Sequence, residues 1–142
     1  MKEVSLQKSL IDRFKTLNKI SGIDFLTDSN VSYPNKPFTK PDDKRWFEVT
    51  FLNNEPEVLA DFYGNLSRWN GILQIDICTP LEKGEDEAYT KYEWISKIFR
   101  RGDTFDDIMI DNCYIADRET ETDHYRTVVR VNWEADTDDE KE

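Results

Sequence analysis

The stretch Arg68–Gly102 constrains the fold more than any other part of the sequence, because its hydrophobic period changes once along its length. Apolar side chains alternate through Trp69–Thr79, which predicts a strand with one apolar face. Pro80 ends this strand, since proline has no N–H to give to a sheet. The alternating side chains of this face are Leu73, Ile75 and Ile77.

The second half of the same stretch has the period of a helix. Its apolar positions, which are spaced by four, three and four residues, are Ala88, Tyr92, Ile95 and Phe99. This spacing predicts a helix over Ala88–Arg101 with one buried face. Arg100 and Arg101 are expected in its last turn, where cations suit the negative end of a helix, and Gly102 is expected to end it. The helix should lie back on the sheet.

A second amphipathic helix is predicted near the start of the chain, over residues 3–20, with Gly22 as its stop. One face of this helix carries Leu6, Leu10, Phe14, Leu17 and Ile20. The short apolar run Ile23–Leu26 could form a strand. The four further strands that we predict are Arg45–Leu52, Glu57–Tyr63, Ile108–Ala116 and His124–Ala135.

This order of elements predicts an α+β fold, a mainly antiparallel sheet with two helices packed on one face. The charged segment Asp117–Asp123 is expected to be the loop of the last hairpin. Trp69–Thr79 and His124–Ala135 would each span roughly 35–40 Å, about twice the length of a usual strand. Strands that extend past their helical cover need either a bend or a partner, which favours assembly.

The segment Thr27–Asp43 carries three prolines and several Asn and Asp residues, which is typical of a loop. It also holds Val31, Tyr33 and Phe38, apolar side chains that a fully mobile loop has little reason to keep. We expect an extended arm or a loop fastened to the sheet edge. These three residues either pack within the chain or form a docking loop.

Length and charge limit the class of protein. A chain of 142 residues favours one domain, here residues 1–135, followed by an acidic and disordered tail, residues 136–142. The net charge of −11 argues against direct nucleic-acid binding and against an acidic membrane as partner. We expect neither a membrane span nor a signal peptide. Cys78 and Cys113 are expected to be free thiols in a reducing cytoplasm.

The sequence carries few residues that could perform chemistry. We expect no catalytic residues, no cofactor and no metal, because the sequence has no Cys/His spacing for zinc, no glycine-rich phosphate loop and no nucleophile elbow. His124 lies in or beside the charged hairpin and is expected to be exposed and inert. Acidic pairs are common in so acidic a chain, so a two-carboxylate hydrolase stays open but is not favoured. The chain is not expected to be an enzyme.

An ordered set of segments resembles the small tail-terminator proteins of long-tailed bacteriophages. The match covers roughly residues 3–135. Its segments are Val31–Phe38, the Trp-containing strand Arg45–Phe51, the strand of Gly71–Gly84 with Gln74 and Pro80, the helix that ends Phe99-Arg100-Arg101-Gly102, and a final strand pair.

This resemblance implies an assembly function. Members of that family are similar in fold to a small α/β sandwich that forms a hexameric ring. The ring caps the completed tail tube, stops its polymerisation and provides a surface for the head-side connector. The implied partners are therefore other copies of the chain, the tail-tube protein and the connector protein. The implied location is the head-proximal end of the virion tail, after synthesis in the cytoplasm of the host bacterium.

Arginine and tryptophan most often anchor protein interfaces, so they supply the candidates for contact between subunits. These candidates are Arg45, Trp46, Arg68, Trp69, Arg100 and Arg101. Two other functions stay open. One is a different head–tail completion or neck protein, and the other is an acidic protein that inhibits a DNA-binding enzyme by mimicking its charge.

Overall fold

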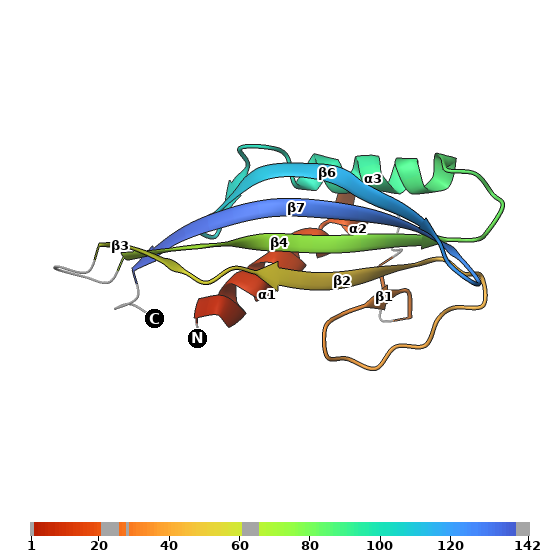
Figure 1. Cartoon of the computed structure of the whole chain (residues 1–142), viewed down its shortest axis with the longest axis horizontal. Coiled ribbons are helices and arrows are strands. Elements are labelled where there is room, and N and C mark those ends of the chain that lie inside the picture. The colour runs from red at the N-terminus through yellow and green to blue at the C-terminus, as the bar shows by residue number, and fades with distance from the viewer. Residues whose placement is uncertain (1, 21–25, 28, 61–65, 139–142) are drawn as a thin grey trace.

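A computed structural model describes residues 2–20, 26–27, 29–60 and 66–138, and it has an α+β architecture (Figure 1). Helices and strands follow in the order helix, strands, helix, strands, as the sequence predicts. The elements are α1 (Lys2–Lys15), α2 (Leu17–Ile20), β1 (Val31–Ser32), β2 (Trp46–Asn53), β3 (Glu57–Ala60), β4 (Leu66–Thr79), α3 (Asp86–Ile98), β5 (Thr104–Phe105), β6 (Ile108–Thr120) and β7 (Tyr125–Asp138).

The strands form one sheet of mixed type, in the order β1-β2-β4-β7-β6-β5, with β3 paired to the start of β4. Every pair is antiparallel except β1 and β2, which are parallel. The expectation of a mainly antiparallel sheet therefore needs this one correction. Residues 33–45 connect the parallel pair, and a connection of about a dozen residues is what parallel pairing requires.

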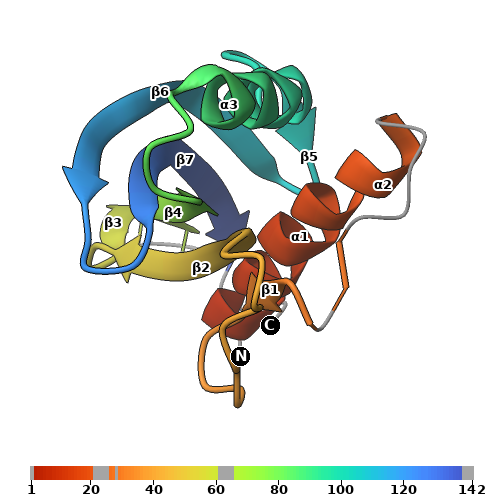
Figure 2. The same ribbon diagram turned by 90° about the vertical axis from the view of Figure 1, so that its right-hand side faces the viewer.

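The two longest strands, β4 and β7, pair along their whole lengths, from Leu66 opposite Asp138 to Thr79 opposite Tyr125. The sheet curves, and α1 and α3 lie inside the curve (Figure 2). Two irregularities in β6, near Asp111 and Ala116, add to this curvature, because a bulge bends its strand and increases the local twist. The long strands that the sequence predicts are thus present, and they are bent.

The core fills the concave side, and it uses the faces that the hydrophobic periods predict. The buried residues of the helices are Leu6, Leu10, Phe14, Leu17, Ala88, Ile95 and Ile98, together with Phe99 directly after α3. They pack on the strand residues Phe47, Val49, Leu73, Ile75, Ile77, Val129, Val131 and Trp133. The Phe14 ring meets the Phe47 ring edge-on at 5.7 Å, which joins α1 to β2.

The first helix is interrupted where one continuous helix was predicted. Its backbone leaves α1 at Thr16, whose N–H and hydroxyl both donate to the Arg13 carbonyl, at 3.1 and 2.6 Å. A threonine hydroxyl that bonds back to the preceding turn competes with the regular ladder, which explains the break. The predicted stop at Gly22 lies outside the described residues, as does most of Ile23–Leu26, and Leu26 itself is buried outside any strand.

The helix α3 ends at Ile98, three residues before the predicted end. Arg13 of α1 donates to the Ile98 carbonyl at 2.9 Å, so a side chain from another element satisfies the end of the helix. Arg100 and Arg101 therefore lie in the following turn and not in the helix. Gly102 adopts a φ of +86°, which glycine tolerates, and its N–H donates to the Ile110 carbonyl at 2.7 Å.

The predicted hairpin loop Asp117–Asp123 is mostly strand. β6 continues to Thr120 and β7 begins at Tyr125, and the backbone ladder between them places Glu119 opposite Arg126 and Thr120 opposite Tyr125. At its far end β7 reaches Asp138, three residues past the expected boundary of the acidic tail, and residues 139–142 lie outside the described part of the chain. The short strand β5 was not predicted.

Cys78 and Cys113 are both unpaired thiols. Cys113 pairs with Val131, which pairs with Leu73, five residues from Cys78 along β4. That offset is roughly 16 Å, far beyond the reach of a disulfide. Burial raises the pKa of each thiol to about 12, so both are poor nucleophiles at neutral pH.

The packing of α3 on the core can be tested at Phe99, which follows the last residue of α3 and has no exposed surface. We expect Phe99→Ala to lower the free energy of unfolding by about 3–5 kcal/mol, the usual loss for a buried aromatic ring. Chemical denaturation measures this change. Tyr89→Ala, on the exposed face of the same helix, is the control and should cost less than about 1 kcal/mol. An equally small loss for Phe99→Ala would contradict the described core.

Candidate functional site

The six predicted interface residues do not form one surface. Trp46 lies opposite Cys78 on β4, whereas Arg68 is ten residues earlier on that strand, roughly 33 Å away. Arg45 donates to Glu87 at 2.7 Å, and Arg68 makes a two-pronged contact with Asp136 at 2.8 and 3.2 Å. Both of these arginines are thus paired within the chain.

The two tryptophans of this set also serve packing. Trp46 is only 1% exposed, and it lies on the outer face of β2, where Phe38 and His124 contact its ring. Trp69 is partly buried against the core. Arg100 and Arg101 are the exposed members, although Arg100 Nε donates to the Lys97 carbonyl at 3.2 Å.

The three apolar residues of the predicted docking loop hold it against the rest of the chain. Val31 is buried in β1, and Tyr33 packs partly against the core, with the ammonium groups of Lys15 and Lys36 within 6 Å of its ring. Phe38 reaches the Trp46 ring at 6.4 Å. All three residues therefore pack within the chain, β1 forms the edge of the sheet, and a docking role for this segment stays a prediction.

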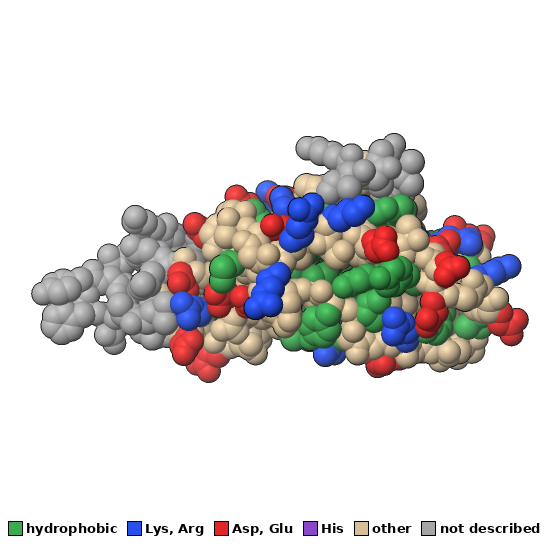
Figure 3. Space-filling model, turned by 90° about the horizontal axis from the view of Figure 1, so that it is seen from above, with side chains coloured by type: hydrophobic (Ala, Val, Ile, Leu, Met, Phe, Trp, Pro, Cys, Tyr) green, Lys and Arg blue, Asp and Glu red, His purple; other side chains and the backbone are tan. Residues whose placement is uncertain are grey.

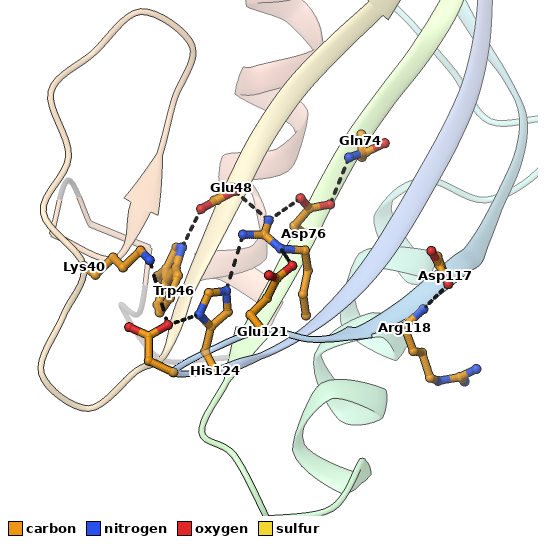
Figure 4. Close-up of polar contacts among 11 residues, drawn as sticks. Lys40, Trp46, Glu48, Gln74, Asp76, Asp117, Arg118, Glu121 and His124 are labelled. Carbon is orange, nitrogen blue, oxygen red and sulfur yellow. Dashed lines mark hydrogen bonds and ion pairs between the residues drawn. The ribbon is translucent and has the colours of Figure 1, made fainter.

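A cluster of charged side chains lies on the outer face, at the end of the sheet where the last hairpin turns (Figure 4). Arg126 of β7 donates to Glu48 of β2 at 2.6 Å and to Asp76 of β4 at 2.5 Å. Glu121 approaches the same guanidinium at 3.5 Å. This Arg126 cluster joins three neighbouring strands through side chains, in addition to their backbone ladders. Sequence reasoning missed it, because these residues are far apart in the chain.

Burial and pairing act in opposite directions on the two carboxylates of the Arg126 cluster. Burial raises the pKa of Asp76 even though Arg126 favours its ionised form. Burial also pushes the pKa of Glu48 upward, but hydrogen bonds from Arg126 and Trp46 outweigh it, so this pKa is lowered. Asp76 is the more deeply buried of the two, so its ionised form depends more on the guanidinium of Arg126.

His124 was expected to be exposed, and this expectation is wrong. Its side chain is buried, its ring lies 4.6 Å from the Trp46 ring, and its Nδ1 is 2.6 Å from the Asp123 carboxylate. Lys40 and Lys44 also face Asp123, at 3.9 and 3.4 Å. His124 therefore links the hairpin to the loop before β2, which is a structural role that its position in the sequence could not indicate.

The two sides of the sheet differ in charge. Within the described residues, β6 has no strand partner on its outer side beyond Met109, and this acidic edge carries Asp111, Asp117, Glu119 and Glu121. The neighbouring acidic groups, chiefly Asp117 through a hydrogen bond and also Glu121, raise the pKa of Glu119. The opposite side, which we call the basic flank, comprises β1, its loop and the end of α1. It carries Lys15, Lys36, Lys40 and Lys44 beside Asp42 and Asp43.

Apolar side chains are also exposed between α3 and β6. Tyr89 is 52% exposed and contacts Tyr92, whose hydroxyl donates to the Cys113 carbonyl at 3.3 Å. Figure 3, which looks onto the side of α3 and β6, shows apolar surface gathered there among scattered charges. This aromatic patch borders the acidic edge, and together they form a surface suited to contact with another protein.

The described residues offer neither a cluster for a metal ion nor a helix that could span a membrane. In the described ranges, no group of three or more His, Cys, Asp or Glu side chains is placed to hold a metal ion. No described helix is long and apolar enough to span a membrane. The Arg126 cluster is not a candidate for binding either, because its polar groups are already paired with one another, an arrangement that stabilises the fold.

Comparisons with known proteins agree with a structural role. The sequence model of a family described as phage tail terminator protein matches residues 5–133. No curated protein matches the chain. Four chains of solved structures match it. One of them, which carries no functional name, has a TM-score of 0.65 at 12% identity, over 91% of this chain and 94% of that chain. This likeness establishes the fold alone.

The Arg126 cluster can be tested through pH. Arg126→Gln leaves Asp76 and Glu48 without their cation, and we expect a loss of about 3 kcal/mol at pH 7, at the lower end of the range for buried pairs. The loss should shrink toward pH 4, because the unpaired carboxylates then take up protons and their charge no longer has to be buried. Urea denaturation at both pH values measures this.

Arg118→Gln is the matched control, since Arg118 is a half-exposed arginine on the same hairpin that pairs with Glu85 at 3.3 Å. Its effect should stay below about 1 kcal/mol at either pH. A loss for Arg126→Gln that is equal at pH 7 and pH 4 would mean that its carboxylate partners are not what the arginine stabilises.

Proposed function

We propose that this chain, which belongs to the phage tail terminator family, forms a ring that caps the finished tail tube. Membership makes it a structural protein of the bacteriophage tail, which belongs to the virion, and gives it a role in tail completion. The proposal adds that the ring is a hexamer, that it stops further tube subunits from adding, and that it presents a surface to the head-side connector.

The observation that supports a ring is the difference in charge between the two sides of the sheet. The acidic edge along β6 and the basic flank beside β1 lie at opposite ends of the strand order, and within the described chain Lys40 and Lys44 of the flank meet only Asp123 of the hairpin turn among the carboxylates recorded for them. Contact between two unlike surfaces is head-to-tail, and repeated contacts of this kind close into a ring when the rotation between subunits permits. Opposite charges also favour the correct pairing over contact between two like sides.

The total charge explains how a ring could be delayed until it is needed. Each subunit carries −11, so six copies together would carry 6 × (−11) = −66. Repulsion of this size opposes closure in dilute solution. The end of a completed tail tube then supplies the template that offsets the repulsion. A terminator that closed before the tube was finished would lose its target.

The partners follow from this position in the tail. The tube protein contacts one face of the ring, and the head-side connector protein contacts the other. The chain is made in the cytoplasm of the host bacterium and ends at the head-proximal end of the tail. The net charge of −11 argues against direct contact with nucleic acid.

Analytical ultracentrifugation over a salt series, with and without tail tubes, tests the ring. We expect mainly monomer at low salt and larger species as salt rises, because the screening length falls from ~30 Å at 0.01 M to ~8 Å at 0.15 M. Negative-stain images should then show rings on tube ends. A protein that stays monomeric at every salt concentration and ignores tube ends rules the proposal out. A ring found only at the neck identifies a different completion protein.

Of the arginines that the sequence singles out, Arg101 offers the cleanest probe of assembly, since Arg45 and Arg68 are already paired within the chain. Arg101→Glu should weaken ring formation several-fold while leaving the thermal unfolding midpoint unchanged, if Arg101 lies at a subunit contact. Lys83→Glu, an equal charge change in the exposed turn before α3, is the control. Equal effects of both changes would show that only net charge matters.

A further inference from the structure

A cavity of about 630 Å³ lies between α3 and the segment that leads into β2. Its walls combine apolar rings with three cations, and the residues that matter here are Trp46, Trp94, Lys40, Arg45 and Lys91. Asp42 and Asp43 also line it, so the walls carry three positive and two negative charges. A hollow with apolar walls and a few charged groups is typical of a binding site.

Lys91 is the unusual member of this cavity. Its side chain is only 15% exposed, and its ammonium lies over the Phe47 ring at 5.5 Å. The nearest carboxylate oxygen recorded for it in the described chain is Glu87 Oε2, at 3.9 Å, which is too far for a hydrogen bond. Burial lowers the pKa of Lys91, although Glu87 opposes this effect. The ammonium is thus enclosed without a close acceptor.

Glu87 does not make this hydrogen bond in the structure. Its Oε1 accepts from Arg45 at 2.7 Å, and its Oε2 is buried with no hydrogen-bond partner among the described residues. Buried charged groups are ordinarily hydrogen-bonded, because an unsatisfied one is costly. Lys91 and Glu87 therefore form a loose pair that an additional carboxylate could complete on the side of the lysine.

The surface of the chain also holds a group of carboxylates with too few cations. Asp117, Glu119 and Glu121 lie together on the acidic edge, and the pKa of Glu119 is raised chiefly by its hydrogen bond to Asp117. The acidic edge runs along β6, whereas the cavity lies beside β1 and β2; among the described residues of one chain, the hairpin is seen to reach the cavity wall only through Asp123 and His124, at Lys40 and Trp46. A head-to-tail contact brings the acidic edge of one copy to the basic flank of the next.

We infer that the cavity between α3 and the β2 approach is a socket for a second copy of this chain, in which Lys91 binds a carboxylate of the neighbouring acidic edge. The inference rests on the proposed ring and names the contact that closes it. The entering carboxylate accepts from the Lys91 ammonium, and the neighbour's strand covers the apolar walls. The excess negative charge of one copy and the enclosed cation of the next then neutralise each other at every junction.

Zero-length cross-linking tests this contact, because a carbodiimide joins an ammonium to a carboxylate that touches it. A one-to-one mixture of unlabelled and ¹⁵N-labelled chain, assembled on tail tubes, separates products between copies from products within one copy. We expect Lys91 of one copy to be joined to Asp117, Glu119 or Glu121 of another. Products that join Lys91 only to Glu87 within one copy, or only to the tube protein, would overturn the inference.

Substitution gives an independent measurement. Lys91→Gln keeps most of the side chain over Phe47 and removes the charge, so the protein concentration for half-maximal ring formation should rise about tenfold or more. Lys97→Gln, on the exposed surface of the same helix, is the matched control and should change it less than about twofold. Circular dichroism confirms that both variants fold.

A charge exchange separates this contact from a general effect of net charge. Lys91→Glu and Glu119→Lys should each weaken assembly, and a chain that carries both changes should recover part of it. Rings that form equally well with Lys91→Gln would overturn the socket and leave the ring proposal intact. Failure of the unchanged protein to form rings at all would instead overturn the proposed function on which the socket rests.

Discussion

The fold depends on the pairing of β4 with β7, which runs unbroken from Leu66 opposite Asp138 to Thr79 opposite Tyr125. Every other part of the sheet is attached to this pair, β2 and β3 through β4 and β6 through β7. So long a ladder cannot stay flat, because strands twist, and the resulting curve creates the concave side that α1 and α3 fill. The core is thus a consequence of strand length as much as of hydrophobic content.

The two faces of the curved sheet are stabilised in different ways. The concave face is apolar, and its strength comes from close packing between helices and strands. The outer face carries the Arg126 cluster, in which a guanidinium joins the carboxylates of two neighbouring strands. Arginine suits this position because its planar group can bind several oxygens at once. His124 and Trp46 extend the same cluster to the loop before β2.

The exposed charges of the chain contribute little to its stability. Paired charges such as Arg68 with Asp136 and Arg45 with Glu87 are satisfied within the chain, and exposed pairs of this kind contribute little to folding. The acidic edge and the enclosed Lys91 are not satisfied to the same degree. In a protein of the tail terminator family, groups of opposite charge that are only loosely paired within one chain are the natural places to look for contacts between chains.

The sequence by itself determined the α+β class, the core faces and the resemblance to tail terminators. These depend on the spacing of apolar residues and on the order of the elements, both of which can be followed along the chain. Only the tertiary structure decided where α3 ends, since Arg13 caps it from another helix. It also decided that His124 and Trp46 are buried. The Arg126 cluster and the cavity around Lys91 join residues far apart in the chain, and no pattern along a sequence records such contacts. They exist because a curved sheet brings distant strands and loops together.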